Sequence, residues 1–201
     1  MRLSTIPTYK IHLNKTAVQD RYVYRFLKRL FGTIFSAIAI ILLSPFIAII
    51  AIKIKAFDKG SVFFKQTRIG MNEKPFTLYK FRTMHEGSDD IIKQYEKENQ
   101  IKGAMFKIKD DPRITPFGKF LRRHSFDELP QLFNVIKGDM ALIGPRPPLP
   151  REVENYTDYD MQIFYVKPGC SGLWQVTYRN EISFSERIQQ DLYYIDHANI
   201  F

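Results

Sequence analysis

The sequence predicts an α+β membrane protein. We expect a membrane-embedded, re-entrant N-terminal helix, followed by a small cytoplasmic domain of amphipathic helices and a short β-hairpin or sheet. Residues 31–52 form an apolar run of 22 residues without a charge, and basic residues flank it on both sides. Beyond it, residues 62–70 and 75–84 are rich in β-forming residues, and several later segments have helical periodicity.

The apolar run is long enough for a membrane helix, but a proline interrupts it. As one straight helix it would extend roughly 33 Å, just enough to cross a bilayer's hydrocarbon core. Pro45 removes a backbone donor and clashes with the preceding turn, so we expect a kink at Ser44-Pro45. The pieces on either side, about 14 and 7 residues, are each too short to span alone.

Charge on both flanks favours a helix that turns back. Residues 1–30 carry seven basic side chains against Asp20 alone, a net charge of +6, and the thirty residues after the run are also basic. Basic flanks prefer the cytoplasmic side of a membrane. We therefore expect a basic segment at 1–24, a re-entrant helix at 25–55 and a cytoplasmic domain at 56–201. The alternative is an ordinary spanning helix, whereas a signal peptide fits poorly because no small-x-small cleavage site follows.

Composition limits the remaining classes of function. Of the total charge of +9, most lies before the apolar run, as expected for contact with anionic lipid rather than nucleic acid. The lone cysteine, Cys170, excludes an internal disulfide and fits a reducing compartment. The four histidines are scattered without a ligand-like spacing, so a structural zinc site is not expected.

The first half of the soluble part contains a predicted hairpin and a predicted helix. The two β-forming stretches are separated by Met-Asn-Glu-Lys and are typical of a hairpin. Residues 86–101 mix both charges and predict a solvated helix or a mobile excursion. Thr115-Pro116 is a good helix start, and Phe117, Phe120 and Leu121 share one face of that helix. The face suits either a lipid interface or packing on the protein's own core.

The second half predicts two further helices separated by extended segments. Ser125 to Glu128 matches a capping box, with a helix over 129–137 ending at Gly138, although Pro130 favours a start one or two residues later. Residues 143–150 contain four prolines and predict a rigid extended turn. Residues 161–176 predict strand, turn and strand, and Ser183-x-x-Glu186 opens a helix through Tyr194.

Asp127 and Glu128 are the strongest candidates for chemistry. Acidic residues are common in the first turn of a helix for purely structural reasons. However, a helix start also attracts phosphate, and Arg113, Arg122 and Arg123 precede the pair closely, with guanidinium groups suited to bidentate phosphate binding. In such a pair one carboxylate can attack as a nucleophile while the other holds a divalent cation.

Other constellations are weaker. Asp89-Asp90 and Asp110-Asp111 are similar to metal-binding carboxylates of glycosyltransferases, but solvated turns explain both pairs. His124, Ser125 and Asp127 have the residue types of a triad, yet neighbours in one turn cannot align as one. No Gly-rich phosphate loop of the Walker or Rossmann kind occurs.

Several motifs in order resemble one family. They cover roughly residues 25–196 and include FFKQTRIGMNEKPFTLYKFRTM, DPRITPFGKFLRRHSFDELPQLFNVIKGDMALIGPRPPLP and KPGCSGLWQVTYRN. The chain resembles the bacterial sugar transferases, the monotopic phosphoglycosyl transferases that start capsule, O-antigen and exopolysaccharide synthesis. The resemblance implies transfer of a phosphosugar from a UDP-sugar to polyprenyl (undecaprenyl) phosphate with release of UMP. It also implies a Mg²⁺ cofactor and a re-entrant helix kinked at Ser-Pro in the bacterial inner membrane, with the catalytic domain, residues 56–201, on the cytoplasmic face.

The resemblance also implies roles for individual residues. Asp127 would be the nucleophile, passing through a covalent aspartyl-phosphosugar, and Glu128 would be the Mg²⁺ ligand. The remaining implied residues bind substrate: those near the phosphates and metal are Lys80, Arg82, Arg122, Arg179 and Asp191, and those of the nucleotide pocket are Pro145, Arg146 and Pro147. Without the resemblance, Lys80 and Arg82 would be exposed strand cations and Asp191 an ordinary surface acid.

The sequence departs from the family pattern at two places, and two alternative functions remain. Tyr178 stands where many relatives have glycine, and the chain stops at Phe201 where larger relatives continue, so we expect a small-type or truncated member. Expected partners are the UDP-sugar, polyprenyl phosphate and membrane phospholipid, without nucleic acid, and a homo-oligomer is left open. The alternatives are a non-enzymatic membrane-surface binding protein and a metal-dependent glycosyltransferase that releases UDP.

Overall fold

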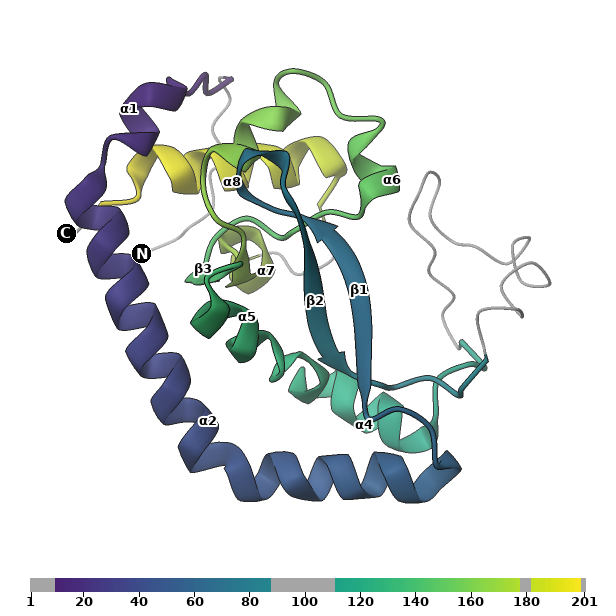
Figure 1. Ribbon diagram of the computed structural model, residues 1–201. Helices are drawn as coiled ribbons and strands as arrows, with labels where there is room; N and C mark the ends of the chain where they lie inside the picture. Colours follow the sequence, from purple (N-terminus) through teal and green to yellow (C-terminus); the bar gives the residue numbers. More distant parts are fainter. Residues whose placement is uncertain (1–9, 88–110, 178–181, 200–201) are drawn as a thin grey trace. The chain divides into compact units, whose positions relative to one another are not determined.

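The computed structural model describes residues 10–87, 111–177 and 182–199. The chain forms two compact units (Figure 1). The first unit comprises Met1–Ile38, Thr67–Thr77 and Leu132–Phe201, and the second comprises Ala39–Gln66 and Leu78–Gln131. In chain order the elements are α1 (Lys15–Gln19), α2 (Tyr22–Asp58), β1 (Phe63–Ile69), η1 (Met71–Glu73), β2 (Pro75–Phe81), α4 (Pro116–Arg123), η4 (Phe126–Glu128), α5 (Gln131–Lys137), β3 (Ala141–Ile143), α6 (Pro150–Val153), η5 (Asp160–Tyr165), β4 (Gly169–Ser171), α7 (Leu173–Thr177) and α8 (Phe184–His197).

The predicted apolar helix is present as α2. Over Tyr22–Phe57 it is long and apolar enough to cross a membrane, with a mean hydropathy of 2.7 in its most apolar window. Pro45 lies inside this helix, which Figure 1 labels α2. Pro45 cannot donate to the Ile41 carbonyl, and the Ser44 hydroxyl donates to that oxygen instead, at 2.8 Å. Ser44 therefore satisfies the acceptor that the proline leaves open.

The core of the second unit joins α2 to the segment that carries the candidate carboxylates. Its buried members are Ile50, Ile54, Phe81 and Leu121. The α2 residues of this cluster recur at helical spacing, so one face of α2 between residues 46 and 54 packs on β2 and α4. The opposite side exposes large apolar side chains, including Ile41, Leu42, Ile49 and Ile52.

The core of the first unit is built from α1, η5 and α8. Its buried residues are Ile11, Val18, Ile163, Phe164, Ile188, Leu192 and Ile195. The two-stranded sheet in this unit is parallel, with Ala141 opposite Gly169 and Ile143 opposite Ser171. The other sheet pairs β1 with β2 and confirms the predicted hairpin.

Two arginines near the start of α2 donate hydrogen bonds to the C-terminal carbonyls of other helices in the first unit. The Arg21 guanidinium donates to the carbonyls of Ile195 and Ala198, both at 2.9 Å, at the C-terminus of α8. The Arg29 guanidinium donates to the carbonyls of Val135 and of Ile136, where α5 ends. Carbonyls at a helix C-terminus lack backbone partners and favour a cation. Part of the basic charge assigned to lipid therefore stabilises the fold.

Three predicted features of helix ends are confirmed. Thr115 caps α4 by accepting from the Gly118 amide, with Pro116 in the first turn. Ser183 and Glu186 form the predicted capping box of α8, which continues to His197. The Gly138 amide donates to the Asn134 carbonyl after α5, and Gly138 has the positive φ, 93°, that suits glycine there. Residues 86–101 lie largely outside the described residues.

Two predictions were wrong. Ser125 does not cap a helix: it is left-handed, and its side chain makes no capping bond, because a 3₁₀ turn precedes Pro130 and α5 begins only at Gln131. Residues 161–176 contain one short strand instead of two. Asp160 accepts from the Thr157 amide at 2.9 Å and starts η5, and Gln175 accepts from the Gly172 amide at 2.7 Å and starts α7.

Candidate active site

Asp127 and Glu128 lie in η4, a single 3₁₀ turn that α2 and α4 hold in the second unit. Ser125, with φ of 57°, reverses the chain between α4 and η4. Phe126 then packs edge-on against Phe46, one residue after Pro45, with ring centroids 5.0 Å apart. Phe126 also packs on the apolar cluster around Leu121. The part of α2 just after Pro45 and the turn that carries Asp127 and Glu128 are thus in direct contact.

Asp127 is a buried carboxylate surrounded by charges of both signs. It is 8% exposed. Burial raises its pKa above the usual aspartate range, and the negative charge of Glu128 raises it further. Lys80 and Arg122 oppose this by stabilising the ionised form. The two cations therefore offset part of the cost of burying the charged carboxylate.

Glu128 forms an ion pair with Lys80 of β2. The Lys80 ammonium lies 2.6 Å from Glu128 Oε1, and the two side chains are 25% and 34% exposed. Because the pair is partly exposed, the Glu128 carboxylate is open to solvent. Alternation along β2 places Lys80 and the buried Leu78 on one side and Phe81 on the other, so the strand orients the ammonium toward η4.

Arg122 is held beside β2 by a threonine that the sequence did not single out. Its Nε donates to the Thr83 hydroxyl at 2.9 Å. The close approach of α4 requires Gly118, where a Cβ would lie 2.1 Å from the Thr83 carbonyl oxygen. Thr83 therefore fixes both the start of α4, through the Thr115 amide, and the Arg122 guanidinium.

The predicted guanidinium cluster is only partly present. Arg113 is buried and forms a two-pronged ion pair with Asp111, through Nε at 2.8 Å and a terminal nitrogen at 2.6 Å. Asp111 is likewise buried, and the pairing holds the pKa of its carboxyl below the usual range. The expectation that Asp111 lies in a solvated turn is wrong. Asp89, Asp90 and Asp110 lie outside the described residues.

Arg82 forms a hydrogen bond and an ion pair just after the hairpin. Its Nε donates to the Ser61 carbonyl at 2.5 Å, and a terminal nitrogen lies 3.8 Å from Glu86. These contacts direct its guanidinium toward the connection between α2 and β1. Its role in substrate binding stays a prediction.

The first unit contains the second group of predicted site residues. Pro145 and Pro147 are buried and Arg146 between them is exposed. Arg68, a buried residue that the sequence did not single out, donates to the Pro147 carbonyl at 3.0 Å. The Gly144 backbone lies so close to Gly169 that a Cβ at Gly169 would be 2.1 Å from the Gly144 amide nitrogen. These contacts hold the proline loop against the turn before β4.

Asp191 of α8 lies close to the same loop. It is 4% exposed, and its Oδ1 has no hydrogen-bond partner among the described residues. Burial raises its pKa to about 8, and the Arg146 charge opposes that rise. The expectation of an ordinary surface acid, made without the resemblance, is therefore wrong. Arg179 lies outside the described residues.

The carboxylates fit Mg²⁺ only together with other ligands. Among the described residues there is no group of three or more histidine, cysteine or acidic side chains that could hold a metal. Mg²⁺ is usually bound by one or two carboxylates together with substrate phosphates and waters. Glu128, a third exposed and adjacent to Asp127, matches that requirement.

The site therefore brings a buried carboxylate, a second carboxylate and cations together beside an apolar helix. The profile of the family described as "Bacterial sugar transferase" matches residues 23–201. The chain belongs to this family.

Three relatives show how far the similarity extends. The undecaprenyl-phosphate galactose phosphotransferase of Salmonella typhimurium is 42% identical over 85% of this chain and 37% of its own length. The exopolysaccharide production protein ExoY of Rhizobium meliloti is 38% identical over 87% of this chain and 79% of its own length. The UDP-glucose:undecaprenyl-phosphate glucose-1-phosphate transferase of Xanthomonas campestris pv. campestris is 37% identical over 96% of this chain and 39% of its own length. The chain thus spans about two fifths of the first and third relatives and about four fifths of ExoY.

Proposed function

We propose that this protein transfers a phosphosugar from a UDP-sugar to polyprenyl (undecaprenyl) phosphate and releases UMP. The observation that carries the proposal is the buried Asp127 beside the Lys80–Glu128 ion pair. Two relatives whose names specify undecaprenyl phosphate match most of the chain. The product would start the synthesis of a capsule, O-antigen or exopolysaccharide.

The reaction has two displacements at one phosphorus atom. An Asp127 carboxylate oxygen attacks the β-phosphorus of the UDP-sugar and forms an oxygen–phosphorus bond. The bond from that phosphorus to the bridging oxygen breaks, and UMP leaves with the oxygen and its electron pair. A polyprenyl phosphate oxygen then attacks the same phosphorus, which releases the Asp127 carboxylate and gives polyprenyl diphosphosugar. One buried carboxylate thus serves a soluble and a lipid substrate in turn.

Cations are needed because an anion attacks an anion. Two like charges 4 Å apart cost on the order of 4 kcal/mol at an effective dielectric constant near 20. Lys80 and Arg122 both lower the pKa of Asp127 and so place positive charge where the phosphates must bind. Glu128 would hold Mg²⁺, which when bound supplies further positive charge for the transferring group.

The contact between α2 and η4 supports a site at the membrane surface. Residues 46–54 of α2 pack on the core that carries Asp127 and leave the opposite side apolar and exposed. A helix half packed on the catalytic unit is not surrounded by lipid on all sides. We therefore propose that α2 is re-entrant, kinked at Ser44-Pro45, with the catalytic unit on the cytoplasmic face.

The topology can be tested with single cysteines in a Cys170→Ser background. Lys15→Cys and Lys59→Cys place exposed thiols before and after the apolar stretch. An impermeant maleimide should label both from the same side in right-side-out and inverted vesicles. Labelling from opposite faces would replace the re-entrant helix with a spanning one.

Nucleotide release tests the activity. The full chain in detergent with Mg²⁺, polyprenyl phosphate and a panel of UDP-sugars should release UMP with one donor. Asp127→Asn, which keeps size but not charge, should reduce release to background, and Asp158→Asn, an exposed aspartate, should not. Because burial raises the pKa of Asp127, the Asn variant removes the cost of burying a charged carboxylate at neutral pH.

Two outcomes would contradict the proposal. Release of UDP instead of UMP would indicate a glycosyltransferase, and no nucleotide release with any donor would favour a membrane-surface binding protein. Without lipid acceptor, intact-protein mass spectrometry should detect the added mass of a phosphosugar on the wild type and not on Asp127→Asn.

A further inference from the structure

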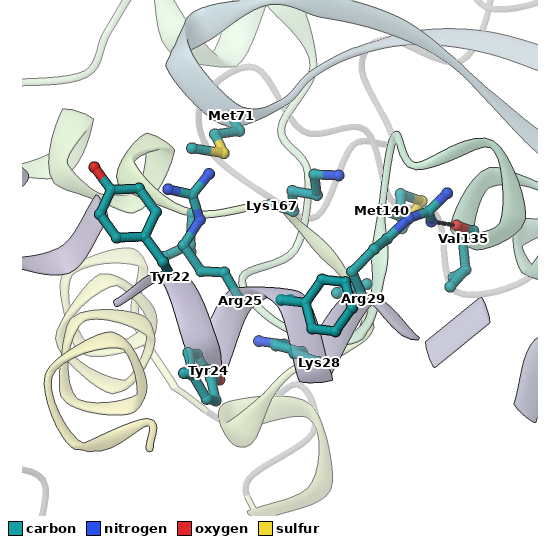
Figure 2. A pocket seen from close by; sticks show the side chains of 12 residues that line it. Tyr22, Tyr24, Arg25, Lys28, Arg29, Met71, Val135, Met140 and Lys167 are labelled. Carbon is teal, nitrogen blue, oxygen red and sulfur yellow. Dashed lines mark hydrogen bonds between the residues drawn. The ribbon is translucent and has the colours of Figure 1, made fainter. Parts of the chain in front are cut away.

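A cavity of about 320 Å³ lies in the first unit, at the start of α2. Its wall, drawn from the described residues, includes four basic residues, Arg25, Lys28, Arg29 and Lys167, and no acidic residue. Figure 2 shows that three of these come from the first turns of α2 and the fourth, Lys167, from the segment before β4. The cavity shares no lining residue with the predicted active site. Its volume is at the lower end of the range for small-molecule sites.

The basic residues of the cavity wall differ in the hydrogen bonds that they make. Arg29 donates to the Val135 and Ile136 carbonyls, and Lys28 donates to the Tyr194 hydroxyl at 2.5 Å. Arg25 donates to the Gln19 carbonyl at 2.5 Å and is otherwise exposed. These acceptors are neutral oxygens, so the bonds leave the positive charge uncompensated.

Lys167 is the basic residue best placed to bind a ligand. It is half-buried, and its ammonium makes no hydrogen bond or ion pair with the part of the chain that the structure describes. Burial lowers the pKa of Lys167, and the charges of Arg29 and Arg25 lower it further, with Asp139 opposing them. Asp139 itself pairs with Lys137 at 3.2 Å. An anion in the cavity would offset this repulsion.

The rest of the wall is apolar and continues onto α2. Val135 and Met140 are each 1% exposed and form part of the cavity wall. Phe26 lines the cavity and is 65% exposed, and Leu30, Ile34 and Ile38 follow it at successive intervals of four residues, each more than 40% exposed. Residues four apart share one side of a helix. An exposed apolar stripe therefore leads from a cationic cavity along the membrane helix.

We propose that this cavity binds the phosphate of an anionic phospholipid, with an acyl chain lying along the stripe from Phe26 to Ile38. Exposed Tyr22 beside Arg25 and Lys28 is the combination of aromatic and basic residues typical of a membrane interface. A free anion would use the cations but not the stripe, whereas a lipid uses both. The site is independent of the proposed sugar-phosphate transfer and uses none of its residues.

Native mass spectrometry of the full chain in detergent tests the proposal. With added phosphatidylglycerol the wild type should retain one lipid, and phosphatidylcholine should bind at least fivefold more weakly. A basic residue near a membrane surface contributes about a fivefold change in affinity for an anionic lipid. Lys167→Gln should therefore weaken phosphatidylglycerol binding about fivefold, and the double variant with Arg25→Gln should weaken it more.

Matched variants distinguish a lipid site from a general effect of surface charge. Lys167→Arg should retain binding because it keeps the charge, and Lys74→Gln, an exposed lysine of the hairpin connection, should leave it unchanged. Asp127→Asn should bind phosphatidylglycerol like the wild type, so failure of the transfer proposal would not affect this result. Equal retention by Lys167→Gln and Lys74→Gln would overturn the proposal. So would displacement of phosphatidylglycerol by inorganic phosphate, or retention of polyprenyl phosphate alone.

Discussion

Asp127 and Asp191 are both buried aspartates, one in each unit, yet their surroundings differ. Asp127 lies beside Lys80, Arg122 and Glu128, and burial raises its pKa against the effect of two cations. Asp191 is still more deeply buried, has an Oδ1 without a partner among the described residues, and is opposed by Arg146. Burial acts on both carboxyls in the same direction. The number of opposing cations differs, because two lower the pKa of Asp127 and one lowers that of Asp191.

The difference suggests separate roles for the two residues. A carboxylate nucleophile must be ionised at working pH, which the cations near Asp127 favour. A carboxyl with a pKa near 8 is mostly protonated at neutral pH and can donate a hydrogen bond. Asp191 in its protonated form is thus suited to donate a hydrogen bond to a phosphate oxygen.

The largest effect that tests this comparison is expected at Lys80. Lys80→Met removes the cation that lowers the pKa of Asp127 and leaves Glu128 without its 2.6 Å partner. UMP release should fall by about a hundredfold, as when one charge-stabilising donor is removed from an active site. The acidic limb of the pH–rate profile should also move to higher pH, because Asp127 then ionises less readily.

Matched variants make this result specific. Lys80→Arg keeps the charge and should keep the position of the acidic limb, even if the rate falls through altered geometry. Lys74→Met removes an exposed lysine of the hairpin connection and should change neither quantity. If Lys80→Met lowers the rate without moving the acidic limb, Lys80 does not control the ionisation of Asp127.

A smaller effect is expected on stability at Asp191. Its pKa is raised from 3.8 to about 8 in the folded protein, so the folded state retains a proton that the unfolded chain loses. The stability contributed by this proton is complete below about pH 4 and is lost as pH rises to about 8. The Tm of the wild type should therefore fall from about pH 5 to about pH 8.5 more steeply than that of Asp191→Asn.

The slope of Tm against pH, not the absolute Tm, tests this titration. An asparagine amide adds a buried donor that needs a partner, so the variant as a whole can be less stable at every pH. Asp158→Asn, on the exposed surface, should follow the wild-type curve. Parallel curves for the wild type and Asp191→Asn would remove the titration of Asp191 as the cause.

Local patterns in the sequence predicted the elements well and the charged contacts less well. The hairpin, α4 and α8 were predicted because strand composition, Thr115-Pro116 and the Ser183–Glu186 box are local signals. Arg21, by contrast, was counted toward the basic surface near the membrane, and it donates to the Ile195 carbonyl at the end of α8, 174 residues away. Such a contact depends on tertiary packing, which local spacing does not encode.

The candidate site shows the same limit. Asp127 and Glu128 were predicted from adjacent carboxylates and from the family resemblance, but their 3₁₀ turn was predicted as a helix start. The Lys80–Glu128 pair joins residues 48 positions apart. Arg113 was assigned to phosphate binding, although Asp111, two residues earlier, already neutralises it. The sequence predicted which residue types meet, while partner choice required the fold.

The smallest expected effect concerns Ser125, the residue that turns the chain into η4. Its φ of 57° and ψ of 21° are left-handed, a conformation that costs an L-residue with a Cβ about 1–2 kcal/mol. Glycine avoids that cost but loses about 0.5–1 kcal/mol through its greater freedom in the unfolded chain. Ser125→Gly should therefore raise the free energy of unfolding by about 0.5 kcal/mol, or Tm by about 1–2 °C.

Measuring UMP release distinguishes backbone strain at Ser125 from a role of its side chain in the reaction. Because Ser125 already has the left-handed backbone conformation that glycine adopts readily, UMP release by Ser125→Gly should stay within about twofold of the wild type. Ser125→Ala keeps the Cβ and should gain no stability, so it separates the strain from the hydroxyl. If both variants lose UMP release equally, the Ser125 hydroxyl acts on a substrate. The activity of Asp127 and Glu128 then depends on more than the neighbouring charges that distinguish Asp127 from Asp191.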